Sequence, residues 1–302
     1  MRAISFETYG GTDVLQLGDR PVPAIEPDEV LVRVRFAAVN PFDLKLRSGS
    51  MQQFIHPTFP VVPGSEMAGT VEAVGAEVAA VAPGDAVFGW ATSGSYAEFA
   101  AARVVAQKSE HLHWELAASL PVAAEAATRG LRLLALNPYE TLLIHGGAGV
   151  VGSLAVQLAV RSNVTVIATC SARDTDALRQ LGAHPVLYGE GVFERVRELA
   201  PNGVDAVLDT AGAGVLPGSI ELAGGTDRVV TLADPAAHGL GVTFASGTAK
   251  DQNAAVLVAV AALVVSGEVI LPPTRHFALA DAALAQDAVA AGGRRGKVLL
   301  DL

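Results

Sequence analysis

Short apolar runs alternate with turn-forming residues in the first third of the chain. The turns between these runs, such as Ala82-Pro83-Gly84-Asp85, contain residues that favour turn dihedral angles. The runs that predict β-strands lie at residues 30–34, 69–74, 85–88 and 97–100. This pattern predicts a β-rich, barrel-like domain over residues 1–115.

A different pattern begins near residue 116, where apolar strands alternate with amphipathic helical stretches. Strands are predicted at 141–144, 164–168, 204–208 and 228–232, and helices at 151–160 and 176–181. Such alternation is typical of an α/β domain with a doubly wound parallel sheet and right-handed crossovers, here expected over residues 116–266.

The last part of the chain returns to strand and turn character. An apolar stretch at 254–265 predicts a buried or interface helix, and the residues after it, at 269–271 and 296–300, have strand character. We expect residues 267–302 to rejoin the first domain, which makes the α/β domain an insertion.

Composition and charge exclude several classes of protein. The 302 residues carry a formal net charge of −10 and contain no run of Lys or Arg, so a protein that binds duplex nucleic acid is not expected. Cys170 is the only cysteine, which excludes an intrachain disulfide and a cysteine-based zinc site. The N-terminus does not resemble a signal peptide, and residues 254–265 are too few to span a bilayer. We therefore expect a cytoplasmic protein without a membrane segment.

A glycine-rich turn joins the predicted strand 141–144 to the predicted helix 151–160. Its glycines Gly146, Gly149 and Gly152 let the backbone approach an anion, and the free N–H groups at the helix start can then bind a pyrophosphate. We expect a larger residue at Gly149 or Gly152 to abolish cofactor binding and to preserve the fold. The alternative is a glycine-rich turn that binds no ligand.

The residues after the next strand determine which dinucleotide is expected. Sites that prefer NAD carry an acid there for the ribose 2′-hydroxyl, whereas this chain has Ser171 and Arg173. A hydroxyl and a guanidinium suit the 2′-phosphate of NADPH. In the alternative interpretation, Ser171 and Asp174 cap the next helix and Arg173 lies in solvent.

Several segments together resemble a known family along nearly the whole chain. They are Ala38-Val39-Asn40-Pro41-Phe42-Asp43, Pro63-Gly64-Ser65-Glu66-Met67-Ala68-Gly69, Pro83-Gly84-Asp85, Ser95-Tyr96-Ala97-Glu98, the glycine-rich turn, Leu181-Gly182-Ala183 and Gly296-Lys297-Val298. By these segments the chain resembles the quinone oxidoreductase (zeta-crystallin-like) branch of the medium-chain dehydrogenase/reductase superfamily.

The resemblance implies a GroES-like catalytic domain split by a Rossmann domain, NADPH as the cofactor, and a homodimer. It also implies a cofactor-binding set made of Asn40 and Thr128 at the nicotinamide end, Val150 and Val151 at the pyrophosphate, and Ser171, Arg173 and Tyr188 around the 2′-phosphate. Structural alternatives exist for three of these residues. Asn40 can cap a helix that begins at Pro41, Thr128 can bond to a helix carbonyl, and Tyr188 can be an ordinary strand aromatic.

Zinc-dependent relatives place a cysteine and a histidine where this chain has Asn40 and Ser65. Neither residue is a good zinc ligand, so we expect no metal. The expected function is reduction of a quinone or an α,β-unsaturated carbonyl compound by NADPH, with Asn40 and Lys45 as the catalytic candidates. Lys45 can equally point to solvent. The alternative functions are an enoyl-thioester reductase and a non-catalytic, crystallin-like NADPH-binding protein.

Overall fold

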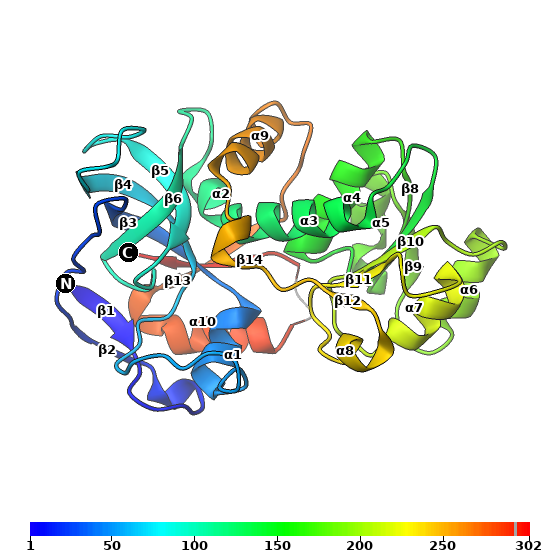
Figure 1. The fold of residues 1–302 in the computed structure, drawn as a ribbon, viewed down its shortest axis with the longest axis horizontal. Helices are drawn as coiled ribbons and strands as arrows, with labels where there is room; N and C mark the ends of the chain where they lie inside the picture. The colour runs from blue at the N-terminus through cyan, green and yellow to red at the C-terminus, as the bar shows by residue number, and fades with distance from the viewer. Residues whose placement is uncertain (293–294) are drawn as a thin grey trace. The chain divides into compact units, whose positions relative to one another are not determined.

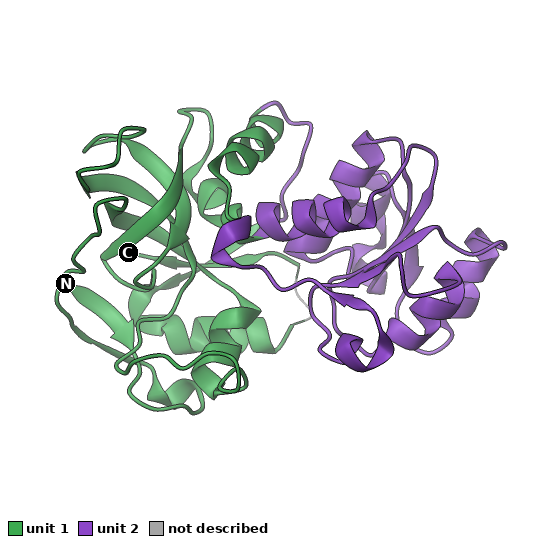
Figure 2. Cartoon of the chain, in the orientation of Figure 1, with its two compact units in different colours: residues 1–122, 252–265, 273–302 green, residues 123–251, 266–272 purple. Residues whose placement is uncertain are grey.

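A computed structural model describes residues 1–292 and 295–302, which form two compact units (Figure 2). Unit 1 contains residues 1–122, 252–265 and 273–302, and unit 2 contains residues 123–251 and 266–272. The chain therefore leaves unit 1, forms most of unit 2 and returns twice. The domain boundaries expected from the sequence, at residues 115 and 266, stay predictions.

Unit 1 is built on a six-stranded sheet of order β13-β14-β3-β4-β5-β6, in which β3 also pairs with β6 (Figure 1). This second pairing closes strands β3 to β6 into a barrel. The strands are β3 (Val30–Val39), β4 (Glu66–Val74), β5 (Ala86–Ala91), β6 (Phe99–Gln107), β13 (Thr274–Ala278) and β14 (Lys297–Asp301), with a separate hairpin of β1 (Arg2–Ser5) and β2 (Gln16–Asp19). The helices are α1 (Pro41–Ser48), α2 (Trp114–Ser119), α9 (Ala254–Val265) and α10 (Ala282–Ala290).

Unit 2 is a parallel six-stranded sheet of order β12-β11-β10-β7-β8-β9. The order reverses between β7 and β10, as in the doubly wound nucleotide-binding folds. The strands are β7 (Thr141–His145), β8 (Thr165–Cys170), β9 (His184–Leu187), β10 (Ala206–Asp209), β11 (Val229–Thr231) and β12 (Thr243–Phe244). The helices are α3 (Pro121–Leu134), which begins in unit 1, and α4 (Val150–Arg161), α5 (Thr175–Gln180), α6 (Val192–Leu199), α7 (Leu216–Ala223) and α8 (Ala237–Leu240).

Each unit has its own apolar core. In unit 1 the core is formed by alternate residues of the barrel strands, such as Val30, Val32 and Val34 of β3, together with small residues of α10. In unit 2, Leu143 and Val207 of the central strands are fully buried beneath α6 and α7. The period-2 pattern of β3 is typical of a strand with one face buried. The continuous apolar runs of β7 and β10 are typical of strands that are buried on both faces.

The structure confirms the predicted fold class, and the expected strands and helices other than 269–271 are present, with bounds that differ by up to seven residues. The expectation of strand character at 269–271 was wrong, since this described stretch pairs with no strand. The side chain of Gln157 replaces a strand partner there: its Nε2 donates to the Ile270 carbonyl at 2.9 Å, and its Oε1 accepts from the Ile270 N–H at 2.7 Å.

Candidate functional site

The glycine-rich turn lies at the carboxyl edge of the parallel sheet in unit 2, directly after β7. Gly146 has φ +76°, and a Cβ there would lie 2.8 Å from Thr210 Oγ1. A Cβ on Gly152 would strike the carbonyl of Gly146 and approach the Gly147 Cα to 2.9 Å. Gly146 and Gly152 are therefore required by the turn itself, and the expectation that a larger residue at Gly152 preserves the fold was wrong.

The start of α4 leaves backbone donors for an anion. Gly149 is the N-cap residue, and a Cβ on it would meet only the Gly146 carbonyl oxygen, at 3.3 Å. Within the part of the chain that the structure describes, the N–H groups of Val150 and Val151 have no acceptor. Free first-turn donors that follow a glycine-rich turn fit the diphosphate of a dinucleotide.

The predicted 2′-phosphate residues lie together at the adjacent ends of β8 and β9. Ser171 follows β8 directly, and the Tyr188 N–H donates to the Cys170 carbonyl at 3.1 Å, which places Tyr188 beside Ser171 in register. Arg173 lies in the short 3₁₀ helix Ala172–Asp174, is exposed, and has no hydrogen-bond or salt-bridge partner among the described residues. The Ser171 hydroxyl donates to Asp174 Oδ2 at 2.6 Å, which is the contact expected of the capping alternative.

Thr128 lies half-buried on α3, and its hydroxyl forms no hydrogen bond with any described residue. It does not bond back to a helix carbonyl, which removes the structural alternative for this residue. The hydroxyl is therefore available to a ligand.

A buried polar cluster lies next to the glycine-rich turn, at the ends of β7 and β10. Asp209, at the end of β10, accepts the N–H groups of Ala211 and Gly212 and the Thr231 hydroxyl. His145, at the end of β7, contacts Ser219 Oγ at 3.1 Å, and burial lowers its pKa to about 4. The cluster fixes the loops at the carboxyl edge of the sheet, where open α/β sheets bind their ligands.

In unit 1, Asn40 is the centre of a second buried polar cluster. Its Nδ2 donates to Glu66 Oε1 at 2.8 Å, and its Oδ1 accepts from Lys297 Nζ at 2.7 Å. Lys297 Nζ also donates to Glu66 Oε1, and Glu66 Oε2 accepts the Val122 N–H at 2.7 Å. Glu66 is fully buried, and Asn40 and Lys297 are each 5% exposed.

Asp43 continues this cluster one turn into α1. Its Oδ2 accepts the Asn40 N–H at 2.8 Å and the Tyr96 hydroxyl at 3.0 Å, whereas its buried Oδ1 has no hydrogen-bond partner among residues 1–292 and 295–302. Burial raises the pKa of Asp43 to about 7 and raises the pKa of Tyr96 well above its ordinary value. Asn40 is also the N-cap of α1, so its structural alternative and its predicted role are compatible.

Glu66, Tyr96 and Lys297 occur in the motifs on which the family resemblance rests, but no role was predicted for them. Lys45, the predicted catalytic candidate, lies exposed on α1 and its ammonium has no partner in the described residues. A signal that could have found two of the others is a charged residue at the start of a strand, directly before an apolar stretch: Lys297 begins the run Lys297–Asp301, and Glu66 begins Glu66–Val74.

The zinc-site positions are occupied by Asn40 and Ser65 as the sequence shows, and absence of zinc from the protein stays a prediction. Among residues 1–292 and 295–302, no group of three or more His, Cys, Asp or Glu side chains could hold a metal ion. None of the helices described there is long and apolar enough to cross a membrane.

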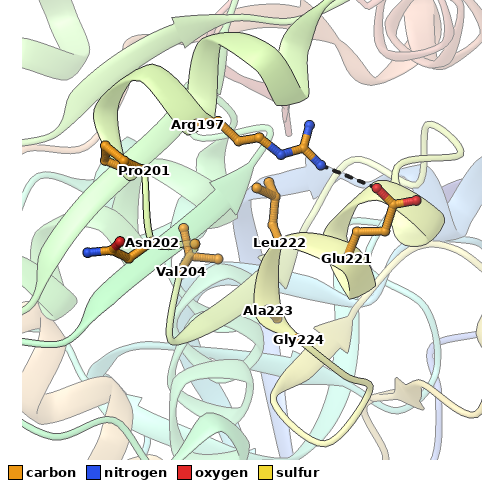
Figure 3. Close-up of a pocket in the computed structure, with 9 residues that line it drawn as sticks. Arg197, Pro201, Asn202, Val204, Glu221, Leu222, Ala223 and Gly224 are labelled. Atoms are coloured by element: carbon orange, nitrogen blue, oxygen red, sulfur yellow. Dashed lines mark hydrogen bonds and ion pairs between the residues drawn. The ribbon is translucent and has the colours of Figure 1, made fainter.

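A shallow pocket of about 280 Å³ lies between the ends of α6 and α7 (Figure 3). Arg197 and Glu221 form a 3.2 Å ion pair beside it. The pocket includes Val204, which precedes β10, and so belongs to the amino edge of the sheet. Because dinucleotides bind at the carboxyl edge, this pocket is not the candidate cofactor site.

Comparison with known proteins places these features in a family. Residues 26–115 match the alcohol dehydrogenase GroES-like domain, and residues 181–300 match the zinc-binding dehydrogenase family model. The chain is 33% identical over 241 residues to a quinone oxidoreductase of Rattus norvegicus. The matched region covers 77% of this chain and 73% of that protein. The chain belongs to the quinone oxidoreductase branch of the medium-chain dehydrogenases/reductases.

Two further relatives are informative. An NADPH-dependent alkenal/one oxidoreductase of Arabidopsis thaliana is 36% identical over 70% of this chain and 58% of its own length. The quinone oxidoreductase of Coxiella burnetii has a solved structure that superposes with a TM-score of 0.87 at 31% identity, covering 100% of this chain and 99% of that one. The chain spans about three fifths of the length of the first curated relatives that it matches.

Proposed function

We propose that this protein is a zinc-independent reductase that transfers a hydride from NADPH to a quinone or an α,β-unsaturated carbonyl compound. The observation that carries the proposal is the turn at Gly146–Gly152, whose crowded glycines form a tight turn and whose Val150 and Val151 N–H groups have no acceptor among the described residues. The names of the relatives support the same reaction: one is a quinone oxidoreductase and another an NADPH-dependent alkenal/one oxidoreductase.

The chain offers residues for each part of the cofactor. Val150 and Val151 bind the pyrophosphate through backbone N–H groups, and Ser171, Arg173 and Tyr188 surround the 2′-phosphate. To bind the phosphate, the Ser171 hydroxyl must give up its hydrogen bond to Asp174 and donate to the phosphate instead. Bound NADPH supplies the hydride.

Asn40 and Thr128 are the residues proposed for the nicotinamide end. The acceptor's own carbonyl delocalises the charge that arrives with the hydride, so the reaction requires a hydrogen-bond donor near that oxygen and a source of one proton. Asn40 retains one N–H that Glu66 does not occupy. Lys45 or a water molecule then provides the proton.

The test is NADPH oxidation by the purified protein with small quinones, enals, enoyl thioesters and simple alcohols in parallel reactions. We expect turnover with quinones or enals and little with the alcohols. Faster turnover of an enoyl thioester favours the alternative reductase, since the same chemistry then acts on a longer substrate. NADPH binding without turnover of any acceptor contradicts the reductase and favours a crystallin-like binding protein.

Two further parts of the proposal concern the setting of the enzyme. We propose a homodimer and a cytoplasmic location. Helix α9 has no polar residue, and its Val258 and Val265 side chains are 54% and 39% exposed, which supports an association surface. Sedimentation velocity of the wild type and of Val258→Glu tests the dimer: a monomer in both, or a dimer in both, contradicts the use of this face.

A further inference from the structure

Three charged or polar side chains that are far apart in sequence meet inside unit 1. Asn40 follows the last residue of β3, Glu66 begins β4, and Lys297 begins β14. Strands β4 and β14 flank β3 on its two sides (Figure 1). Val298 is paired with Val39 and Met67 with Ala37, so the sheet register brings Lys297 and Glu66 to Asn40 from the two neighbouring strands, where their charged groups contact each other as well as the amide.

This arrangement allows the Asn40 amide only one orientation. Oδ1 faces the Lys297 ammonium, which only donates, and Nδ2 faces the Glu66 carboxylate, which only accepts. A half-turn of the amide would place an oxygen against the carboxylate and an NH₂ group against the ammonium. Both contacts would then be repulsive, and the groups are too buried for water to replace them.

Stability alone does not account for such a pair. Burying two charges costs solvation that their mutual attraction often fails to return, and apolar replacements of buried ion pairs are frequently neutral or stabilising. What the Lys297–Glu66 pair does provide is a fixed direction for the Asn40 amide that contacts both groups. One Nδ2–H is used by Glu66, so the second remains as a donor whose direction is set by the pair.

We propose that Lys297 and Glu66 are positioning residues that hold the Asn40 amide with its free N–H toward the carbonyl oxygen of the hydride acceptor. This inference rests on the proposed reductase function and on the role of Asn40 in it. In this arrangement the pair acts only through Asn40. Removal of the pair should therefore slow hydride transfer when Asn40 is present and should have no effect when Asn40 is absent.

A double-mutant cycle tests this coupling. Lys297→Met removes the ammonium and retains the length of the side chain. We expect kcat for a quinone or enal to fall about 10-fold or more, with the Kd for NADPH, measured by fluorescence titration, unchanged within about twofold. In the Asn40→Ala background the same substitution should change kcat by less than about twofold, since the residue through which Lys297 acts is gone.

Controls separate positioning from loss of structure. Lys297→Arg retains the charge and should recover part of the activity. Val32→Ala removes core volume from β3 without touching the cluster, and it should lower the unfolding temperature with kcat preserved. If Lys297→Met unfolds the chain, Lys297→Gln replaces it in the cycle. Equal losses in the two Asn40 backgrounds, or unchanged kcat in Lys297→Met, would overturn the proposal.

A second readout is independent of turnover. The side-chain NH₂ of Asn40, assigned by its disappearance in Asn40→Ala, should exchange with solvent more slowly in the wild type than in Lys297→Met, as measured by NMR. Equal exchange in both proteins means that the pair does not fix the amide. A wild type that binds NADPH and reduces no acceptor contradicts the proposed function, whereas the exchange measurement still decides whether the amide is fixed.

Discussion

Replacing the buried carboxyl of Asp43 by an amide should change how the stability of unit 1 depends on pH. Asp43 is 1% exposed, and burial raises its pKa from 3.8 to about 7 in the folded protein. Between these values the folded protein binds a proton at Asp43 and the unfolded chain does not. The stabilisation from this carboxyl is therefore complete below pH 3.8 and is lost as the pH rises through 7.

The size of the effect follows from the difference between the Asp43 pKa of 3.8 in the unfolded chain and about 7 in the folded protein. Each pH unit corresponds to about 1.4 kcal/mol, so the free energy of unfolding should fall by about 2–3 kcal/mol between pH 5 and pH 8 through Asp43 alone. Asp43→Asn places an uncharged group of the same shape in the cluster and keeps an oxygen for the Asn40 and Tyr96 donors. The variant should therefore lack this contribution.

Urea unfolding followed by tryptophan fluorescence reports the unfolding free energy of unit 1. The two tryptophans, Trp90 and Trp114, both lie in unit 1. The quantity of interest is the difference in unfolding free energy between wild type and Asp43→Asn at each pH, because other titrating groups contribute equally to both proteins. A difference in unfolding free energy that stays constant from pH 5 to pH 8 would refute the claim that Asp43 is protonated in the folded protein below pH 7.

Four other substitutions have definite expected outcomes. Arg173→Asp should weaken NADPH binding by about 1–3 kcal/mol, or about 5- to 150-fold, and leave NADH binding unchanged in fluorescence titrations. Arg197→Asp is the control for the same change of charge. Equal loss of binding for both cofactors would remove Arg173 from the 2′-phosphate site. Gly149→Ala should weaken NADPH at unchanged unfolding temperature, whereas Gly152→Ala should lower the unfolding temperature as well, because its Cβ meets the turn backbone; the opposite ranking in thermal melts would contradict this. Lys45→Ala should retain the fold and slow turnover of an enal if Lys45 supplies the proton, and an unchanged rate assigns that proton to water.

Much of the fold is determined by local sequence signals. Turn chemistry and apolar periodicity predicted the β-rich and α/β parts, and the residues Asn40 and Pro41 marked the start of α1, where the structure has them as N-cap and first helical residue. The glycine-rich turn was also predictable, because the φ of Gly146 and the close contact at Gly152 demand glycine at these positions.

The tertiary structure alone decided which distant residues meet. Asn40 and Lys297 are 257 positions apart, and only the pairing of β14 with β3 brings them within 2.7 Å. The extended residues near Ile270 pair with the side chain of Gln157 in place of a strand, which no local propensity encodes. The pKa of Asp43 is likewise set by burial, because desolvation depends on everything packed around the carboxyl and not on its neighbours in sequence.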